Sequence, residues 1–161
     1  MKTVMAGLLN TLLLLASTSG LCGNNEVLFE RKLEAAVQGD TEAAYDVAYR
    51  YEKGRGTEED EELALEWYSR AAEQGLAKAQ YKVGLFHMKG KGVDEDTATA
   101  RTWLQKSAEQ NYPPAQYQLG RLYAGNAFND YRSALDWLEK AKDNGYEPAS
   151  GEIRKVRKKL D

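Results

Sequence analysis

The sequence predicts an all-α fold, an α-solenoid of antiparallel helix pairs, and three observations support this prediction. Tyr45, Tyr81 and Tyr117 recur with a period of 36 residues. Within each period, small and apolar residues follow the spacing of one helical face. The one change in repeat length falls in a connector, and loops tolerate deletions better than packed helices do. A period of this length indicates stacked units that share one elongated core.

Residues 1–22 are expected to form a signal peptide. Lys2 precedes an apolar run from Val4 to Ala16, and small residues follow, which is the order of a secretory signal. The run is shorter than the roughly 20 residues that cross a bilayer. Cys22 is the only cysteine, and a lipoprotein would keep it as its lipidated first residue. Leu21 stands where a lipoprotein signal has a small residue, so ordinary cleavage is favoured over lipidation or a retained leader.

The predicted repeat domain covers residues 26–160 and opens with a half-repeat at 26–40. Ala35, Ala36 and Gly39 lie 36 residues before Ala71, Ala72 and Gly75, so EVLFERKLEAAVQGD matches the second helix of a repeat without its first.

Three full repeats are expected at 41–76, 77–112 and 113–146. Their first helices (A) are predicted near 41–53, 77–89 and 113–124, and their second helices (B) near 60–74, 96–110 and 131–144. The connectors GRGTEEDEE and GKGVDEDTA share Gly-x-Gly followed by acids, whereas the third reads GNAFNDYRS. Trp67 and Trp103 are 36 residues apart but Trp103 and Trp137 only 34, so the third repeat has lost two residues in its connector.

Each predicted helix carries a packing face. In the first A helix, Ala43, Val47 and Tyr51 recur at helical spacing, with small residues where helices approach closely. In the B helix, Trp67 is expected to be the large buried side chain beside the pair Ala71 and Ala72. The B helices end at Gly75, Asn111 and Gly145, residues that adopt the left-handed conformation.

The segment 147–160 is expected to be the first helix of a fourth repeat without its second. Pro148 stands at its start, and Ala149 lies 34 residues after Ala115. Half-repeats with a polar outer side close both ends, as solubility of a solenoid requires.

The charge balance excludes some classes of partner. The chain of 161 residues has 22 Lys and Arg against 25 Asp and Glu, a net charge of −3, and loss of Lys2 with the leader leaves 21 against 25. A mildly acidic protein is not a general nucleic-acid binder, since such binders need a clustered cationic surface. With no cysteine beyond Cys22, stability must come from packing without disulfides.

These residues resemble the Sel1-like repeat (SLR) family, relatives of tetratricopeptide repeats. The segment AQYKVGLFHMKGKGVDEDTATARTWLQKSAEQN at 79–111 meets nearly every position of the family pattern, and the resemblance covers about residues 28–155. The third repeat departs from the pattern by losing Gly-x-Gly-Val, and the first by having Ala48 in place of Gly. The resemblance implies a right-handed superhelix that holds proteins or peptides on the concave face of its A helices. Without mature cysteines, the chain lies outside the cysteine-rich exported members that have been discussed as binders or hydrolases of cell-wall ligands.

No residue pattern indicates catalysis, a cofactor or a metal. His87 is the only histidine and occupies the slot of Tyr51 and Tyr123, so a packing role is favoured. The acidic run TEEDEE at 57–62 lacks the alternation of a calcium loop and is expected to open a helix. The basic residues 154–159 are interpreted as a polar cap rather than a lipid or nucleic-acid site.

Function is expected where slots of the A helices vary between repeats while the packing slots do not. The candidate partner-binding residues on this face are Asp46, Tyr49, Arg50, Lys82, Phe86, Gln118, Arg121 and Leu122, with aromatic and arginine anchors among them.

We therefore expect an exported, non-enzymatic scaffold, periplasmic or secreted, that binds a protein or peptide, contacts no nucleic acid and is a monomer. Two alternatives remain open. One is binding or hydrolysis of small cell-wall ligands. The other is a membrane-tethered assembly factor that keeps its leader or a lipid on Cys22.

Overall fold

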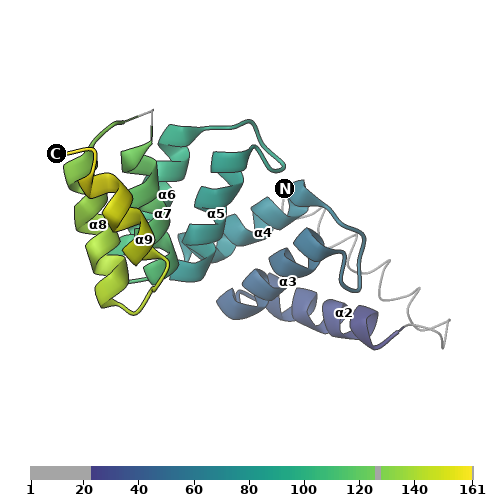
Figure 1. The fold of residues 1–161 in the computed structure, drawn as a ribbon. Coiled ribbons are helices and arrows are strands. Elements are labelled where there is room, and N and C mark those ends of the chain that lie inside the picture. The colour runs from purple at the N-terminus through teal and green to yellow at the C-terminus, as the bar shows by residue number, and fades with distance from the viewer. Residues whose placement is uncertain (1–22, 126–127, 161) are drawn as a thin grey trace.

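The computed structural model describes residues 23–125 and 128–160, and within those ranges the chain forms eight helices and no strand (Figure 1). The expected signal peptide, Cys22 included, lies outside these residues. Along the described ranges, none of the helices combines the length and the apolar character needed to cross a bilayer.

The helices succeed one another from α2 at one end of the molecule to α9 at the other (Figure 1). They are α2 (Asn24–Val37), α3 (Thr41–Lys53), α4 (Glu61–Glu73), α5 (Ala77–Lys89), α6 (Thr97–Glu109), α7 (Pro113–Ala124), α8 (Tyr131–Asp143) and α9 (Ala149–Arg157). Each packs against its neighbours in the chain, and α7 also contacts α9. The predicted all-α array is confirmed: α3, α5, α7 and α9 are the A helices, and α2, α4, α6 and α8 are the B helices. The right-handed sense of the superhelix stays a prediction.

Aspartates begin the B helices that follow a connector. The side chain of Asp60 accepts a hydrogen bond from the Leu63 amide at 2.8 Å, and Asp96 and Asp130 cap α6 and α8 in the same way. An acceptor here satisfies amides that have no partner inside the helix and places negative charge at the positive end of its dipole. The acidic run at 57–62 therefore opens α4, as predicted.

The two glycines of each Gly-x-Gly connector have different tasks. Gly54 and Gly90 end α3 and α5 in the left-handed conformation. At Gly92 (φ +61°), a Cβ would lie 2.5 Å from the carbonyl oxygen of Glu61, because the connector crosses the start of the preceding B helix. At the described end of α7, Gly125 is extended with φ −77°, in contrast to the left-handed Gly54 and Gly90.

The largest side chains of the core come from one repeated position of the B helices, which the sequence analysis did not single out. Tyr68, Leu104 and Leu138 are fully buried on the B helices, and Leu104 lies so close to Gly84 that a Cβ there would be 2.8 Å from the leucine Cγ. Gly120 faces Leu138 at a similar approach, 2.7 Å. Small residues on the A helices therefore set how closely each pair packs.

The expectation that tryptophan is the buried side chain of each B helix is corrected. Trp67 is 3% exposed, but Trp103 and Trp137 are only half-buried. A cationic side chain lies over each indole, from the residue three positions later in the chain. The charged groups of Arg70, Lys106 and Lys140 are 4.2 to 4.3 Å from the ring centroids of Trp67, Trp103 and Trp137. Trp103 also packs against the core of the first repeat, so it joins neighbouring repeats.

Buried glutamines join the repeats by hydrogen bonds. Gln80 Nε2 donates to the carbonyl oxygen of Ala72 at 3.1 Å, and Gln116 does the same to Ala108, so each satisfies a carbonyl at the end of the preceding B helix. Gln110 and Asn144, at the ends of the next B helices, donate back to these glutamines. Their period was visible in the sequence, but their burial was not.

Candidate protein-binding face

Three tyrosines in equivalent slots of the A helices form what we call the tyrosine row: Tyr45, Tyr81 and Tyr117. All three are half-buried. Their rings pair with those of Tyr68, Tyr112 and Tyr146 at centroid distances of 5.2, 5.5 and 5.1 Å. The row therefore presents aromatic surface along three successive repeats. The period identified these positions as packing slots only, so the sequence interpretation missed their partial exposure.

In two tyrosines of the row, Tyr45 and Tyr81, the phenol pKa is raised. Burial, followed by the charges of Tyr112, Glu52 and Glu42, raises the pKa of Tyr45 to about 12. Burial also raises the pKa of Tyr81, against an opposing hydrogen bond from Gln118. At neutral pH each ring offers an apolar face and a hydroxyl that can donate a hydrogen bond, which suits protein recognition.

Beside the row, Glu52 binds three helices together. Its Oε2 accepts hydrogen bonds from Tyr68 Oη and from Lys82 Nζ, both at 2.7 Å. Burial acts to raise the pKa of Glu52, but the hydrogen bonds from Lys82 and Tyr68 outweigh it, and the pKa lies below its usual value. Lys82 was expected to face a partner, but its ammonium is occupied by this internal contact.

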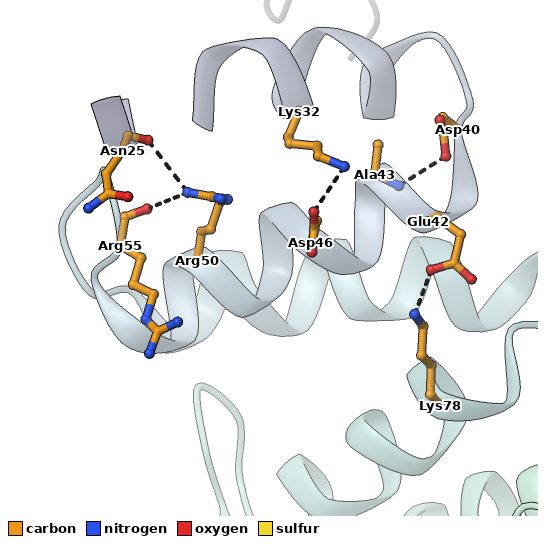
Figure 2. A network of polar contacts seen from close by, with 9 residues as sticks. All are labelled: Asn25, Lys32, Asp40, Glu42, Ala43, Asp46, Arg50, Arg55 and Lys78. Atoms are coloured by element: carbon orange, nitrogen blue, oxygen red, sulfur yellow. Dashed lines mark hydrogen bonds and ion pairs between the residues drawn. The ribbon is translucent and has the colours of Figure 1, made fainter. Parts of the chain in front are cut away.

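Asp46 and Arg50 hold α2 to α3 (Figure 2). Asp46 pairs with Lys32 of α2 at 3.0 Å, and its side chain stays 42% exposed. Arg50 Nη1 donates to the carbonyl oxygens of Asn25 at 3.4 Å and Arg55 at 3.3 Å, and its Nε is buried without a partner. Arg50 therefore belongs to helix packing rather than to an open face.

The equivalent slots on α5 and α7 correct the expectation in the same way. Phe86 is 2% exposed, with its ring centroid 5.5 Å from that of Tyr68 in a T-shaped arrangement, and so does not project from the face. Leu122 is half-buried against the core around Leu104 and Leu119. The physical reason is helical spacing, since residue 50 follows Ala43 and Val47 by seven and three positions and continues their buried stripe.

Three predicted residues remain accessible beside the tyrosine row. Tyr49 is half-buried with the Arg55 guanidinium 5.3 Å from its ring centroid, and Gln118 is half-buried against Tyr81. Arg121 is exposed, with its guanidinium 5.7 Å from the Tyr117 ring centroid. With Asp46, these residues and the row define the A-helix face, and partner binding by them stays a prediction.

The described ranges hold no cluster of three or more His, Cys, Asp or Glu able to bind a metal ion. His87 is half-buried, and its Nδ1 is buried without a hydrogen-bond partner in the described structure.

Comparison with known proteins agrees with this architecture. The Sel1 repeat profile matches residues 41–76, 77–112 and 113–146. No curated protein matches the chain.

Several solved structures are similar. A Sel1 repeat protein from Oxalobacter formigenes is 36% identical over 73% of this chain and 49% of its own, with a TM-score of 0.69. A protective antigen of uropathogenic Escherichia coli strains that displays an SLR fold is 35% identical over 75% of this chain and 26% of its own, with a TM-score of 0.72. An immunity protein from Pseudomonas aeruginosa is 28% identical over 77% of this chain and 47% of its own, with a TM-score of 0.54.

The chain thus spans about half or less of the length of these three relatives. Because three consecutive repeat units match the profile and stack as helix pairs, the chain belongs to the Sel1 repeat family.

Proposed function

We propose that this protein is an exported, non-enzymatic scaffold that binds another protein or peptide in the cell envelope through its A-helix face. Sel1 repeats generally mediate protein–protein interactions. The observation that carries the proposal is the tyrosine row, since half-exposed, rigid aromatic rings with polar tips are typical anchors of protein interfaces.

The face is suited to binding because its rings are already ordered. The pairs Tyr81–Tyr112 and Tyr117–Tyr146 hold each other in place, so a partner need not pay the full entropy of fixing them. Variation at residues 49, 85 and 121, which are Tyr, Leu and Arg, gives each repeat a different neighbour for its tyrosine.

Photocrosslinking in the native cell envelope tests the proposal. Leu85 is half-buried in the slot that Tyr49 and Arg121 hold in the other repeats, so we include it in the A-helix face. A photoreactive residue is placed at Leu85 or Arg121, and Glu73, which is exposed on α4, serves as the control. We expect one protein to be captured from the first two positions and not from Glu73. Equal capture at all three, or capture from Glu73 alone, would remove the A-helix face from the proposal. Phe86 is unsuitable because it is buried.

The tyrosine row also favours one alternative, binding of a cell-wall glycan fragment, because aromatic side chains line many small-ligand sites. Calorimetric titration with purified wall fragments distinguishes the two functions. Binding that is lost in Tyr81→Ala, together with no captured protein, would favour the glycan.

Export rests on residues 1–22, which precede the described part of the chain. The mass of the protein purified from an envelope fraction tests it. A mass that corresponds to a chain starting after Gly20 or after Cys22 supports cleavage of the signal peptide. An intact leader or a lipid on Cys22 would favour the tethered assembly factor.

A further inference from the structure

Charge is distributed unevenly along the array. Residues 23–76 contain six Lys and Arg against fourteen Asp and Glu, whereas residues 113–160 contain nine against six. The first repeat and its preceding helix are therefore acidic, and the last repeat with α9 is basic. A partner that follows the A-helix face meets opposite potentials at its two ends.

At the first two repeats, the charges of the A-helix face are paired internally. Glu42 bonds to Lys78 at 2.5 Å, and Asp46 bonds to Lys32 (Figure 2). Glu52 bonds to Lys82. Little net charge is left on this part of the face for a partner to neutralise.

At the last repeat and α9, Arg157 bonds to Glu139 at 2.7 Å, but other cations are not compensated in this way. Within the described ranges Arg121, Arg154 and Lys158 have no acidic partner within ion-pair distance. Lys155 bonds to Glu152 on its own helix, but its side chain remains 73% exposed, so water and other anions reach it freely. The uncompensated charge of the face is thus cationic and lies at its α9 end.

The tyrosine row ends at the same place. Gly151 lies 34 residues after Tyr117, in the slot that holds tyrosine three times before. A Cβ at Gly151 would meet no atom within 4 Å. Gly151, Arg154, Lys155 and Lys158 line a shallow depression at the surface. The row therefore finishes in an open position with room for a foreign side chain and cations around it.

We propose that the α9 end of the A-helix face binds an acidic segment of the protein partner, with an apolar side chain of that segment over Gly151 and its carboxylates on Arg121, Lys155 and Lys158. This inference rests on the proposed function and names the chemistry of the partner. Charge-assisted bonds from Arg and Lys to carboxylates give orientation and salt-dependent affinity. A long polyanion such as nucleic acid fits less well, because it would extend from the cationic end toward the acidic first repeat.

Fluorescence anisotropy with labelled peptides on the full chain tests this. The probe is Glu-Glu-Glu-Leu-Glu-Glu-Glu, with Gln in place of every Glu and Gly in place of Leu as matched peptide controls. We expect binding of the probe that weakens with salt, at least about tenfold weaker binding of the Gln peptide, and a smaller loss for the Gly peptide.

Variants of the protein locate the site. Arg121→Glu combined with Lys155→Glu, and separately Gly151→Tyr, should each weaken probe binding at least about tenfold. Arg132→Glu, an exposed charge reversal on α8, should leave binding unchanged. Unchanged melting temperatures show that the variants fold.

Three results would overturn the inference: no binding of the probe up to about 1 mM, unchanged binding by the double variant, or tighter binding of single-stranded RNA or anionic phospholipid vesicles than of the probe. Crosslinking from Leu85 separates this failure from that of the proposed function. A protein captured at Leu85 without probe binding keeps the proposed function and rejects the acidic partner. Loss of both rejects the A-helix face.

Discussion

At the scale of single residues, two helical glycines differ in what surrounds them. A Cβ at Gly84 would lie 2.8 Å from Leu104 Cγ and 3.2 Å from the Ala100 carbonyl oxygen, whereas one at Gly151 would meet nothing within 4 Å. The first glycine is a packing requirement between α5 and α6. The second leaves a surface position open.

Alanine at these positions should act in opposite directions. Gly84→Ala should lower the free energy of unfolding by about 1–3 kcal/mol, because Leu104 must shift and overpacking outweighs the gain in helix propensity. Gly151→Ala should raise it by up to about 1 kcal/mol, since it gains propensity without a clash. Urea denaturation measures both, and a Gly84→Ala protein as stable as Gly151→Ala would contradict the close approach.

The buried phenol of Tyr45 predicts a loss of stability in alkali. Its pKa is raised from 10.0 to about 12 in the folded protein. As pH rises from the unfolded value to the folded value, the unfolded chain releases the proton and the folded chain keeps it, so the free energy of unfolding falls. This contribution is fully present below the unfolded pKa.

We expect chemical denaturation midpoints to be steady at neutral pH and to decrease once pH exceeds the ordinary pKa of 10.0. Tyr45→Phe should fall less steeply because the titrating group is gone. The same slope in both proteins would show that other groups cause the alkaline loss.

At the scale of elements, the connector determines how each A helix meets the preceding B helix. Gly92 has φ +61°, and a Cβ there would lie 2.5 Å from the backbone oxygen of Glu61 at the start of α4. Lys91 beside it forms an ion pair with Glu61. The third connector is two residues shorter and lacks the Gly-x-Gly pair in its sequence.

Gly92→Ala should therefore be more costly than an alanine at a helix end with free space. Gly92→Ala combines left-handed strain with a clash against backbone and should lower the free energy of unfolding by about 2–4 kcal/mol. Gly75→Ala, at φ +92° with nothing within 4 Å, should lower it by only about 1 kcal/mol. Equal losses in thermal or urea unfolding would mean that the contact with Glu61 contributes nothing.

At the scale of the whole molecule, a cationic residue at each end of the helix array opposes stacking of a second copy. Arg154 of α9 stands in the slot of Gly84 and Gly120, and Lys32 of α2 stands in the slot of Leu104 and Leu138. A second copy stacked end to end would have to bury both cations against each other. Repeat arrays need such polar ends to stay soluble.

The chain should therefore be a monomer, and light scattering after size exclusion at about 0.1 M salt should give the mass of one chain. Arg154→Ala together with Lys32→Leu removes both charges and should promote concentration-dependent association. A wild-type dimer, or a double variant that stays monomeric at high concentration, would contradict this role for the ends.

The repeat architecture could be predicted from the sequence because each solenoid unit contacts only its neighbours. The same residue types are therefore needed at the same positions of every repeat. The spacing of Tyr45, Tyr81 and Tyr117, the shortened third connector and the half-repeats were read from residues alone. The start of α4 within the acidic run at 57–62 followed from the preference of the helix dipole for acids.

Which row of each A helix faces outward was decided only by the tertiary structure. Consecutive residues on a helix differ by about 100° in direction, so neighbouring rows have similar sequence spacing and only the packed partner separates them. This is why Phe86 was expected on the face and is 2% exposed, and why Lys82 is tied to Glu52. The partial burial of Trp103 and the buried hydrogen bonds that Gln80 and Gln116 donate also depend on contacts with the adjacent repeat. The sequence by itself determined the repeat and its boundaries, and the contacts between repeats decided which side chains remain for a partner.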